Sequence, residues 1–117
     1  MALGTTITQT DDGVVTLAFS GELDISRADE VERELEQIES GKPTTLVFDL
    51  RGLDFLDSTG LRIILGADSR ARREGRRVAI VPGPERVHRV FRITLLDRRL
   101  EFADTPESAA GDRDAGD

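Results

Sequence analysis

The sequence predicts an α/β domain built on a mixed β-sheet of four to five strands, with helices packed mainly on one face. Two β-rich runs between Thr5 and Ser20 are separated by Asp11-Asp12-Gly13, and Asp-Gly between such runs is a strong hairpin signal. Beyond the hairpin, strand patterns alternate with helical patterns, which is typical of parallel strands joined by crossover helices. In the second run Val15, Leu17 and Phe19 alternate on one apolar face, so helices are expected on one side of the sheet.

The first helix is expected after a turn, Gly21-Glu22-Leu23-Asp24, that leaves the second strand. Ser26 is expected to open this helix, because Asp29 follows three residues on in an arrangement like a capping box. Gly41 ends the helix. The buried stripe is Ala28, Val31, Leu35 and Ile38. The outward face carries Glu30, Glu32, Arg33, Glu34 and Glu36. A solvated charged face is the default interpretation, and a docking surface for a basic partner is the alternative.

A buried strand over Thr45–Leu50, a short connection over Arg51–Leu56 and a second helix are expected next. The helix begins at Asp57-Ser58-Thr59, three helix-capping residue types in a row. Its apolar stripe is Leu61, Ile64, Leu65 and Ala71. Gly75 follows an arginine-rich last turn, where a glycine commonly ends a helix.

The start of this second helix is a candidate site, because its first amides lack intrahelical acceptors and favour a negative charge nearby. If Asp57 is the N-cap, Ser58 is the first helical residue and its hydroxyl is free. If Ser58 is the cap, an amide occupies that hydroxyl, and the sequence does not distinguish the two arrangements. Gly60 in the first turn costs about 1 kcal/mol relative to Ala. Close approach by another backbone is one gain that could offset this cost.

The remaining chain is expected to form a fourth strand over Arg76–Val81, a turn at Pro82-Gly83-Pro84 and a short helix. Pro84 is expected at the first helical position. The stripe of the short helix is Val87, Val90 and Phe91. His88 falls off that stripe and is expected at the exposed surface. A short last strand is expected at Leu100-Glu101-Phe102.

No sustained periodicity follows Asp104, and the last residues are polar, acidic and rich in Gly and Ala. We therefore divide the chain into a domain over residues 1–105 and a mobile acidic C-terminal tail over 106–117. At most one turn of helix is expected in the tail, and its removal is expected to leave stability nearly unchanged.

The length, the net charge and the residue composition of the chain argue against several classes of function. A chain of 117 residues forms one domain, and a net charge of −7 argues against a groove that binds nucleic acid. One histidine and no cysteine argue against a zinc site, and no cofactor is expected. No apolar run approaches the length of about 20 residues that spans a bilayer, and the N-terminus lacks the regions of a signal peptide. We expect a cytoplasmic protein without direct contact to nucleic acid or membrane.

An enzyme that uses Ser58 as nucleophile and His88 as base is the competing function class. The chain lacks a Gly-x-Ser-x-Gly motif, and nothing in the sequence places its only histidine near Ser58. The chain also lacks a Gly-x-x-x-x-Gly-Lys phosphate loop, so ATP would have to come with a partner kinase. We therefore expect that the chain is not an enzyme.

From Phe48 through Leu65 the chain resembles the STAS domain, in particular the stand-alone bacterial anti-anti-sigma factors (anti-sigma factor antagonists). The matching residues are Phe55-Leu56-Asp57-Ser58-Thr59-Gly60-Leu61. A second match is Gly21-Glu22-Leu23-Asp24. A third is Arg89-Val90-Phe91 followed by Leu95-Leu96-Asp97. The three motifs occur in the order of the family.

The resemblance covers Thr5 to Thr105 and implies that Ser58 is phosphorylated by an anti-sigma factor that is also a serine kinase. The unphosphorylated form would bind this anti-sigma factor and so free a sigma factor, and a serine phosphatase would reset Ser58. The partner-binding residues that the resemblance implies are Asp24, Asp57, Ser58, Thr59, Gly60, Leu61, Arg62 and Ile63. We expect a monomer or weak dimer. A STAS module that binds its partner constitutively, without a phosphorylation cycle, is the alternative.

Two positions depart from the family pattern. Many relatives have Ser where this chain has Thr59, a change that keeps a hydroxyl and leaves open a second phosphate acceptor. Others often have a small residue where Arg62 stands. The second departure bears on the choice of partner rather than on the fold.

Overall fold

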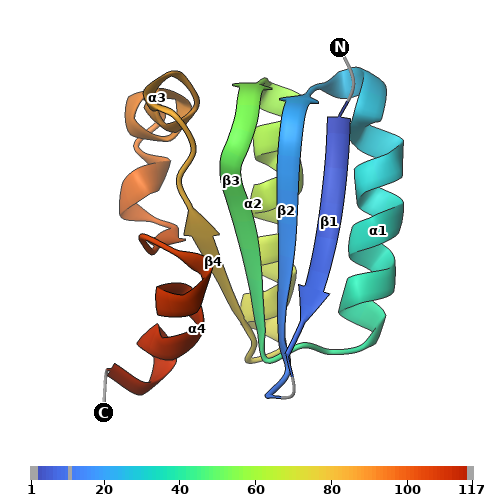
Figure 1. Cartoon of the computed structure of the whole chain (residues 1–117), viewed down its shortest axis with the longest axis vertical. Helices are drawn as coiled ribbons and strands as arrows, with labels where there is room; N and C mark the ends of the chain where they lie inside the picture. The colour runs from blue at the N-terminus through green and yellow to red at the C-terminus, as the bar shows by residue number, and fades with distance from the viewer. Residues whose placement is uncertain (1–2, 11, 116–117) are drawn as a thin grey trace.

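The computed structural model describes residues 3–10 and 12–115 and contains one five-stranded mixed sheet (Figure 1). The strands lie in sequence order, and β1 is antiparallel to β2 while β2 to β5 are mutually parallel. Their bounds are β1 Leu3–Gln9, β2 Val14–Leu23, β3 Thr45–Leu56, β4 Arg77–Val81 and β5 Glu101–Phe102. The predicted hairpin is confirmed, with Gly13 in its connection at a φ of 83°, although Asp11 lies outside the described residues.

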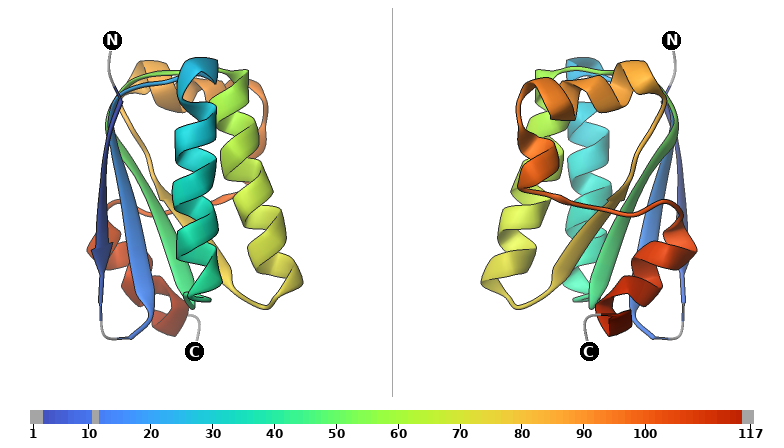
Figure 2. Two further views of the ribbon diagram at one scale, coloured as in Figure 1. Left: turned by 90° about the vertical axis from the view of Figure 1, so that its right-hand side faces the viewer. Right: turned by 90° about the vertical axis from the view of Figure 1, so that its left-hand side faces the viewer.

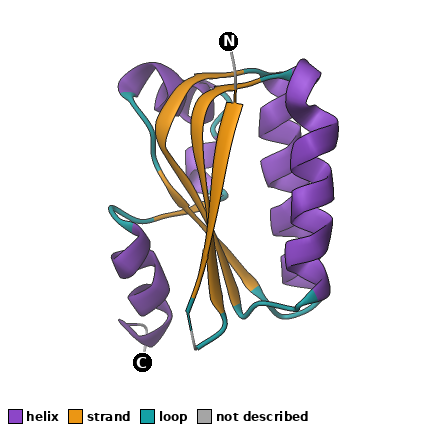
Figure 3. Ribbon diagram, turned by 45° about the vertical axis from the view of Figure 1, so that its right-hand side comes forward, coloured by secondary structure: helices purple, strands orange, loops and turns teal. Residues whose placement is uncertain are grey.

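Within the described residues, four helices and two 3-10 turns accompany the sheet. The helices are α1 Ala28–Ser40, α2 Ser58–Arg73, α3 Glu85–Ile93 and α4 Pro106–Ala115, and the 3-10 turns are η1 Ile25–Arg27 and η2 Leu96–Arg98. Helices α1 and α2 lie side by side on one face of the sheet, and α4 lies on the other face (Figures 2 and 3). The predicted fold class, a mixed sheet covered mainly on one face, is confirmed.

The main core lies between the sheet and helices α1, α2 and α3. The rings of Phe19 from β2 and Phe48 from β3 stack at its centre, with centroids 6.2 Å apart. The predicted helix stripes supply the facing side, and Val31, Ile64 and Phe91 are fully buried. Alternation along the strands and helical periodicity were therefore sufficient to predict this core.

The strands β2 and β3 are longer than predicted. The expected turn at Gly21–Asp24 is strand up to Leu23, and the expected connection over Arg51–Leu56 is the second half of β3. The pairing continues through register shifts after Ala18 and after Gly21, and at each shift β3 contributes one residue more than β2. Gly52 makes this close pairing possible, because a Cβ there would lie 2.6 Å from the carbonyl oxygen of Phe19.

The C-terminal half contains smaller differences from the predictions. Pro84 is the N-cap of α3 rather than its first helical residue, and β4 begins at Arg77. His88 is half-buried rather than exposed, since β5 brings Phe102 against it. The two rings meet edge to face with centroids 5.1 Å apart. A tertiary contact with a later strand therefore covers a side chain that helical periodicity places outside.

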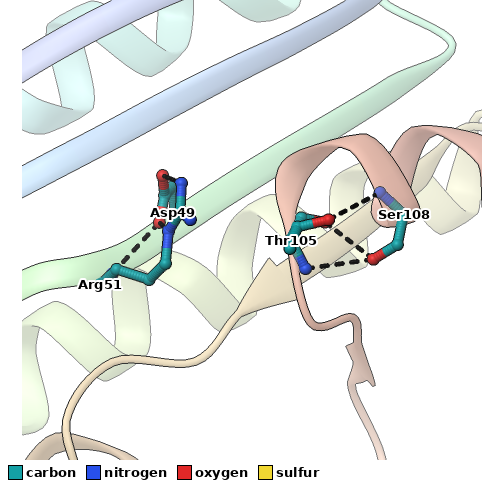
Figure 4. Close-up of polar contacts among 4 residues, drawn as sticks. All are labelled: Asp49, Arg51, Thr105 and Ser108. Carbon is teal, nitrogen blue, oxygen red and sulfur yellow. Dashed lines mark hydrogen bonds and ion pairs between the residues drawn. The ribbon is translucent and has the colours of Figure 1, made fainter.

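The expectation of at most one turn of helix after Thr105 is wrong, because α4 runs from Pro106 to Ala115 and packs on the second face of the sheet. Thr105 and Ser108 cap it reciprocally: the Ser108 amide donates to Thr105 Oγ1 at 3.0 Å, and the Thr105 amide to Ser108 Oγ at 3.1 Å (Figure 4). Ala109 is fully buried. Its cluster also contains Val14, Val47, Ala79, Val81 and Ala103. Residues 116–117 lie outside the described part.

Candidate functional site at the start of α2

Asp57 is the N-cap of α2. It has an extended backbone, and its Oδ1 accepts a hydrogen bond from the Gly60 amide at 3.0 Å. Ser58 is therefore the first helical residue. Its side chain is exposed, and the Ser58 hydroxyl has no hydrogen-bond partner among the described residues. Of the two arrangements that the sequence left open, the structure has the one in which a carboxylate caps the helix and the serine hydroxyl is free.

Asp57 also fixes this helix start to the neighbouring loop. Strands β2 and β3 end in register, with Leu23 paired to Leu56, so the residues that follow them lie side by side. The Asp57 amide donates to the Leu23 carbonyl at 3.3 Å, and Asp57 Oδ2 accepts from the Ile25 amide at 3.2 Å. Asp57 thus joins the two segments that carry the first two family motifs, Gly21-Glu22-Leu23-Asp24 and Phe55-Leu56-Asp57-Ser58-Thr59-Gly60-Leu61.

Gly60 is required by the packing of α2 on the strand ends. A Cβ at this position would lie 2.6 Å from Leu56 Cδ1 and 2.8 Å from Leu23 Cγ, closer than real carbon contacts allow. The close approach that offsets the helical cost of glycine therefore comes from two leucine side chains, not from another backbone as expected. Gly60 brings the first turn of α2 down onto the sheet.

Asp24 caps the 3-10 turn η1. From the sequence, this segment was expected to be the start of the first helix, opened by Ser26. Asp24 Oδ1 accepts from the Ser26 amide at 3.0 Å and from Ser26 Oγ at 2.6 Å. The hydrogen bond from the Ser26 hydroxyl holds the pKa of the Asp24 carboxyl below its ordinary value, so Asp24 is ionised at neutral pH. Helix α1 begins only at Ala28, after Arg27, and has no side-chain cap there.

The residues of the predicted partner surface differ in how exposed they are to solvent. Ser58 and Arg62 are exposed, and Asp24, Asp57 and Thr59 are half-buried. Gly60, Leu61 and Ile63 are buried, with Leu61 and Ile63 only 8% and 7% exposed. The buried three mainly position the helix. A part for these three residues in binding the partner stays a prediction.

Two exposed apolar residues beside the site were missed. Ile25 in η1 is 73% exposed, and Phe55, near the end of β3, is 46% exposed. Phe55 was quoted only as part of the family motif. Ile25 stands alone between two capping residues, Asp24 and Ser26, and belongs to no apolar stripe. An apolar residue outside every buried stripe could have been predicted to be exposed. Both apolar side chains flank the strand ends from which the Ser58 helix starts.

The described residues provide no catalytic pair for Ser58. His88 packs on Phe91 and Phe102, and the hydroxyl of Ser58 has no partner among the residues 3–10 and 12–115. The same part of the chain holds no group of three or more His, Asp or Glu side chains that could bind a metal ion. No helix in it is both long and apolar enough to cross a bilayer.

Comparison with known proteins assigns the fold and the sequence to one family. The model of the STAS domain matches residues 5–109. The chain belongs to the STAS domain family. Its relatives include the anti-sigma F factor antagonist of Paenibacillus polymyxa, 30% identical over 98 residues that cover 83% of this chain and 84% of that protein. The anti-sigma-B factor antagonist of Listeria monocytogenes is 28% identical, with 87% and 90% covered.

A shorter match joins this STAS chain to the anti-sigma-F factor antagonist RsfB of Mycobacterium tuberculosis. The two are 38% identical over 60 residues, and the match spans about half of each protein, 50% of this chain and 49% of RsfB. The antagonists of Paenibacillus polymyxa and Listeria monocytogenes, by contrast, are homologues over most of this chain. The family is non-enzymatic, which confirms the prediction that the chain is not an enzyme.

Solved structures show the same fold. An anti-sigma factor antagonist from Mycobacterium paratuberculosis superposes with a TM-score of 0.83 at 26% identity, covering 93% of this STAS chain and 92% of that one. A putative antagonist from Thermotoga maritima gives 0.85 at 26% identity, with 92% of each chain covered. The antagonist SpoIIAA in its unphosphorylated form gives 0.73 at 22% identity, covering 97% and 100%.

Proposed function

We propose that this STAS protein is an anti-sigma factor antagonist controlled by phosphorylation of Ser58. Unphosphorylated, it binds an anti-sigma factor that has serine kinase activity, and the bound sigma factor is released. The observation that carries the proposal is the free, exposed hydroxyl of Ser58 at the start of α2, where the Asp57 carboxylate has taken the capping role. The homologous antagonists of the F and B sigma systems support the class of partner.

The unmodified surface is shaped for a neutral hydroxyl beside acidic groups. Asp24 and Asp57 flank Ser58 from the two joined strand ends, and both carboxylates are fixed by backbone amides. Exposed Ile25 and Phe55 supply apolar area at the same end of the sheet. A partner that buries this region must place donors or a basic group near the carboxylates and leave room only for a hydroxyl.

Phosphate adds a charge of about −1.5 to −2 at that surface. The helix start favours such a charge, and Arg62 follows Ser58 by four residues, so its side chain can reach the same region of the helix surface. The fold should therefore survive the modification. The antagonist SpoIIAA, whose fold this chain shares, has been solved in both unphosphorylated and phosphorylated forms. The partner interface cannot hold an unpaired buried charge beside two carboxylates, and the complex dissociates.

The same proposal implies a source of ATP, a phosphatase and a cellular compartment. The chain has no phosphate loop of its own, so the partner kinase supplies ATP. A serine phosphatase returns Ser58 to its free form. The cytoplasm is the compartment in which sigma factors meet RNA polymerase, and we place the protein there, without direct contact to nucleic acid or membrane.

The test is phosphate transfer. The purified protein is incubated with its anti-sigma factor and ATP, and the product is mapped by mass spectrometry. We expect one phosphate, on Ser58, and none on a Ser58→Ala variant that still binds the anti-sigma factor. Phosphate found mainly on Thr59 would contradict the assignment. Tight binding without any phosphate transfer would favour the alternative of a constitutive STAS interaction module.

A further inference from the structure

A surface groove of about 590 Å³ runs between α1 and α2 and begins beside the Ser58 helix start. Ile25 and Thr59 line its upper end, and Thr59 directly follows Ser58 in α2. The walls are single helix faces: the α1 residues follow one another at intervals of three or four positions, and so do most of the α2 residues. The groove is therefore continuous with the proposed partner surface and extends it along the helix pair.

The charges of the groove are unevenly satisfied. At its lower end Arg70 of α2 binds Glu39 of α1 with two hydrogen bonds of 2.8 and 2.9 Å, so this pair neutralises itself. Above it, Glu32 and Glu36 form the α1 wall, and neither has an ion-pair partner among the described residues. Arg62 lines the opposite α2 wall. The hydrogen bond to Glu39 and also the charge of Glu32 raise the pKa of Arg70. With Glu39 and Arg70 paired, Glu32 and Glu36 outnumber Arg62, and the groove keeps a net negative charge. Glu32 and Glu36 are part of the acidic face that the sequence showed.

Gly66 forms part of the α2 wall. A glycine inside a helix costs about 1 kcal/mol relative to Ala. Unlike Gly60, this glycine is not required by packing. A Cβ there would meet only the guanidinium of Arg70, at 3.2 Å, and this guanidinium would have to shift by a few tenths of an ångström while it stays paired with Glu39. Because Gly66 has no side chain, the middle of the groove is left wider.

We propose that this groove holds a basic segment of the anti-sigma factor, and that its Lys or Arg side chains pair with Glu32 and Glu36. The exposed side chain of Ile25 at the upper end receives the part of the segment nearest Ser58. The inference rests on the proposed function, because the segment belongs to the partner that covers Ser58. The groove then selects the anti-sigma factor, and the Ser58 phosphate controls release.

The groove is first tested by filling it. Gly66→Leu places a strong helix former in the α2 wall, and Ser69→Leu places the same side chain at an exposed α2 position outside the groove. Affinity for the purified anti-sigma factor that phosphorylates this protein is measured by calorimetry, and folding by the melting temperature. We expect Gly66→Leu to stay folded, with a cooperative melting transition, and to bind at least about tenfold more weakly. Ser69→Leu should bind like wild type.

The basic character of the occupant is tested by removing charge. The double variant Glu32→Gln with Glu36→Gln loses two charges in the groove. The control, Asp104→Asn with Glu107→Gln, loses two charges at exposed positions near α4 on the other face of the sheet. We expect about tenfold weaker binding for the groove variant at low salt, a smaller difference at high salt, and no change for the control.

The outcomes separate the two proposals. Wild type that binds and is phosphorylated on Ser58, together with Gly66→Leu or the groove double variant binding equally tightly, would overturn the groove inference and leave the proposed function standing. Wild type that neither binds the anti-sigma factor nor accepts phosphate would overturn both.

Discussion

Helices α2 and α4 begin with similar residue types but use them in different ways. At α2 the Asp57 carboxylate caps the helix, and the hydroxyl of Ser58 one residue later is left free. At α4 the hydroxyls of Thr105 and Ser108 themselves accept from each other's amides, so both are occupied (Figure 4). A hydroxyl at a helix start is thus available for modification only where another group does the capping.

The third helical position differs as well. Gly60 occupies it in α2 and lies against Leu23 and Leu56, which draws the helix start onto the strand ends. Ser108 occupies it in α4 and completes the reciprocal cap. The α2 start is built around a fixed carboxylate and a missing side chain, and it presents Ser58 to a partner. The α4 start is self-contained and secures a helix that covers the second face of the sheet.

The largest effect is expected from removing α4. Truncation after Thr105 uncovers the small apolar cluster around Val47 and Val81, because Ala109 is fully buried against it. We expect the free energy of unfolding to fall by about 2–4 kcal/mol, measured by chemical denaturation. Ala109→Asp, which keeps the helix but charges its buried face, should give most of the same loss. Unchanged stability in both variants would restore the expectation of a mobile tail.

Exchanging the third helical residues tests the comparison directly. Gly60→Ser gives α2 the cap type of α4, but its Cβ must displace Leu23 and Leu56, and we expect a loss of about 1–3 kcal/mol. Ser108→Gly removes the two hydrogen bonds of the Ser108 hydroxyl, keeps the bond from the amide of residue 108 to Thr105 Oγ1, and should cost about 0.5–2 kcal/mol. Thermal unfolding measures both changes. A stabilised Gly60→Ser protein would show that the α2 start is not limited by packing.

A smaller effect is expected at a buried carboxylate that is satisfied by a guanidinium. Asp49 in β3 accepts two bonds of 2.9 Å from Arg51 (Figure 4). Burial raises the pKa of Asp49, but the hydrogen bonds and charge of Arg51 outweigh it, so the pKa lies below its ordinary value. The ionised form therefore stabilises the fold above the ordinary carboxyl range, and this stabilisation is lost as pH falls through the folded-state pKa.

Asp49→Asn should accordingly lower the free energy of unfolding by about 1–2 kcal/mol at pH 7 and by less near pH 3. Asp54→Asn is the matched control, because its partner Arg86 and Asp54 itself are both exposed at the surface. The control should stay within about 0.5 kcal/mol at both pH values. An Asp49→Asn effect that grows toward acid pH has the wrong sign for a depressed pKa and refutes the assignment.

The sequence was sufficient to predict the elements that build the main core, and insufficient where contacts between distant segments decide. The alternation of apolar residues in β2 and their helical spacing in α1 and α2 predicted the buried faces of these elements. The extension of β3 through Leu56 depends on pairing with β2, and the cover on His88 depends on Phe102, so neither follows from a local pattern.

The error at α4 has another cause. Thr105-Pro106-Glu107-Ser108 did contain a start signal, with a capping threonine, a proline in the first helical position and a glutamate in the first turn. The helix buries alanine rather than larger apolar residues, and so it shows no hydrophobic stripe. Around Ser58 the sequence predicted the helix start but not the capping residue, because Asp and Ser are about equally good caps.

The central claim is that phosphate on Ser58 acts by charge at the partner interface while the domain stays folded. The direct measurement is the affinity of fully phosphorylated protein for the anti-sigma factor, beside unmodified protein, Ser58→Asp and Ser58→Asn. We predict an unchanged fold, at least about 100-fold weaker binding after phosphorylation, and tighter binding by the Asn variant than by the Asp variant. Phosphorylated protein that is folded and binds as tightly as the unmodified form would contradict the account.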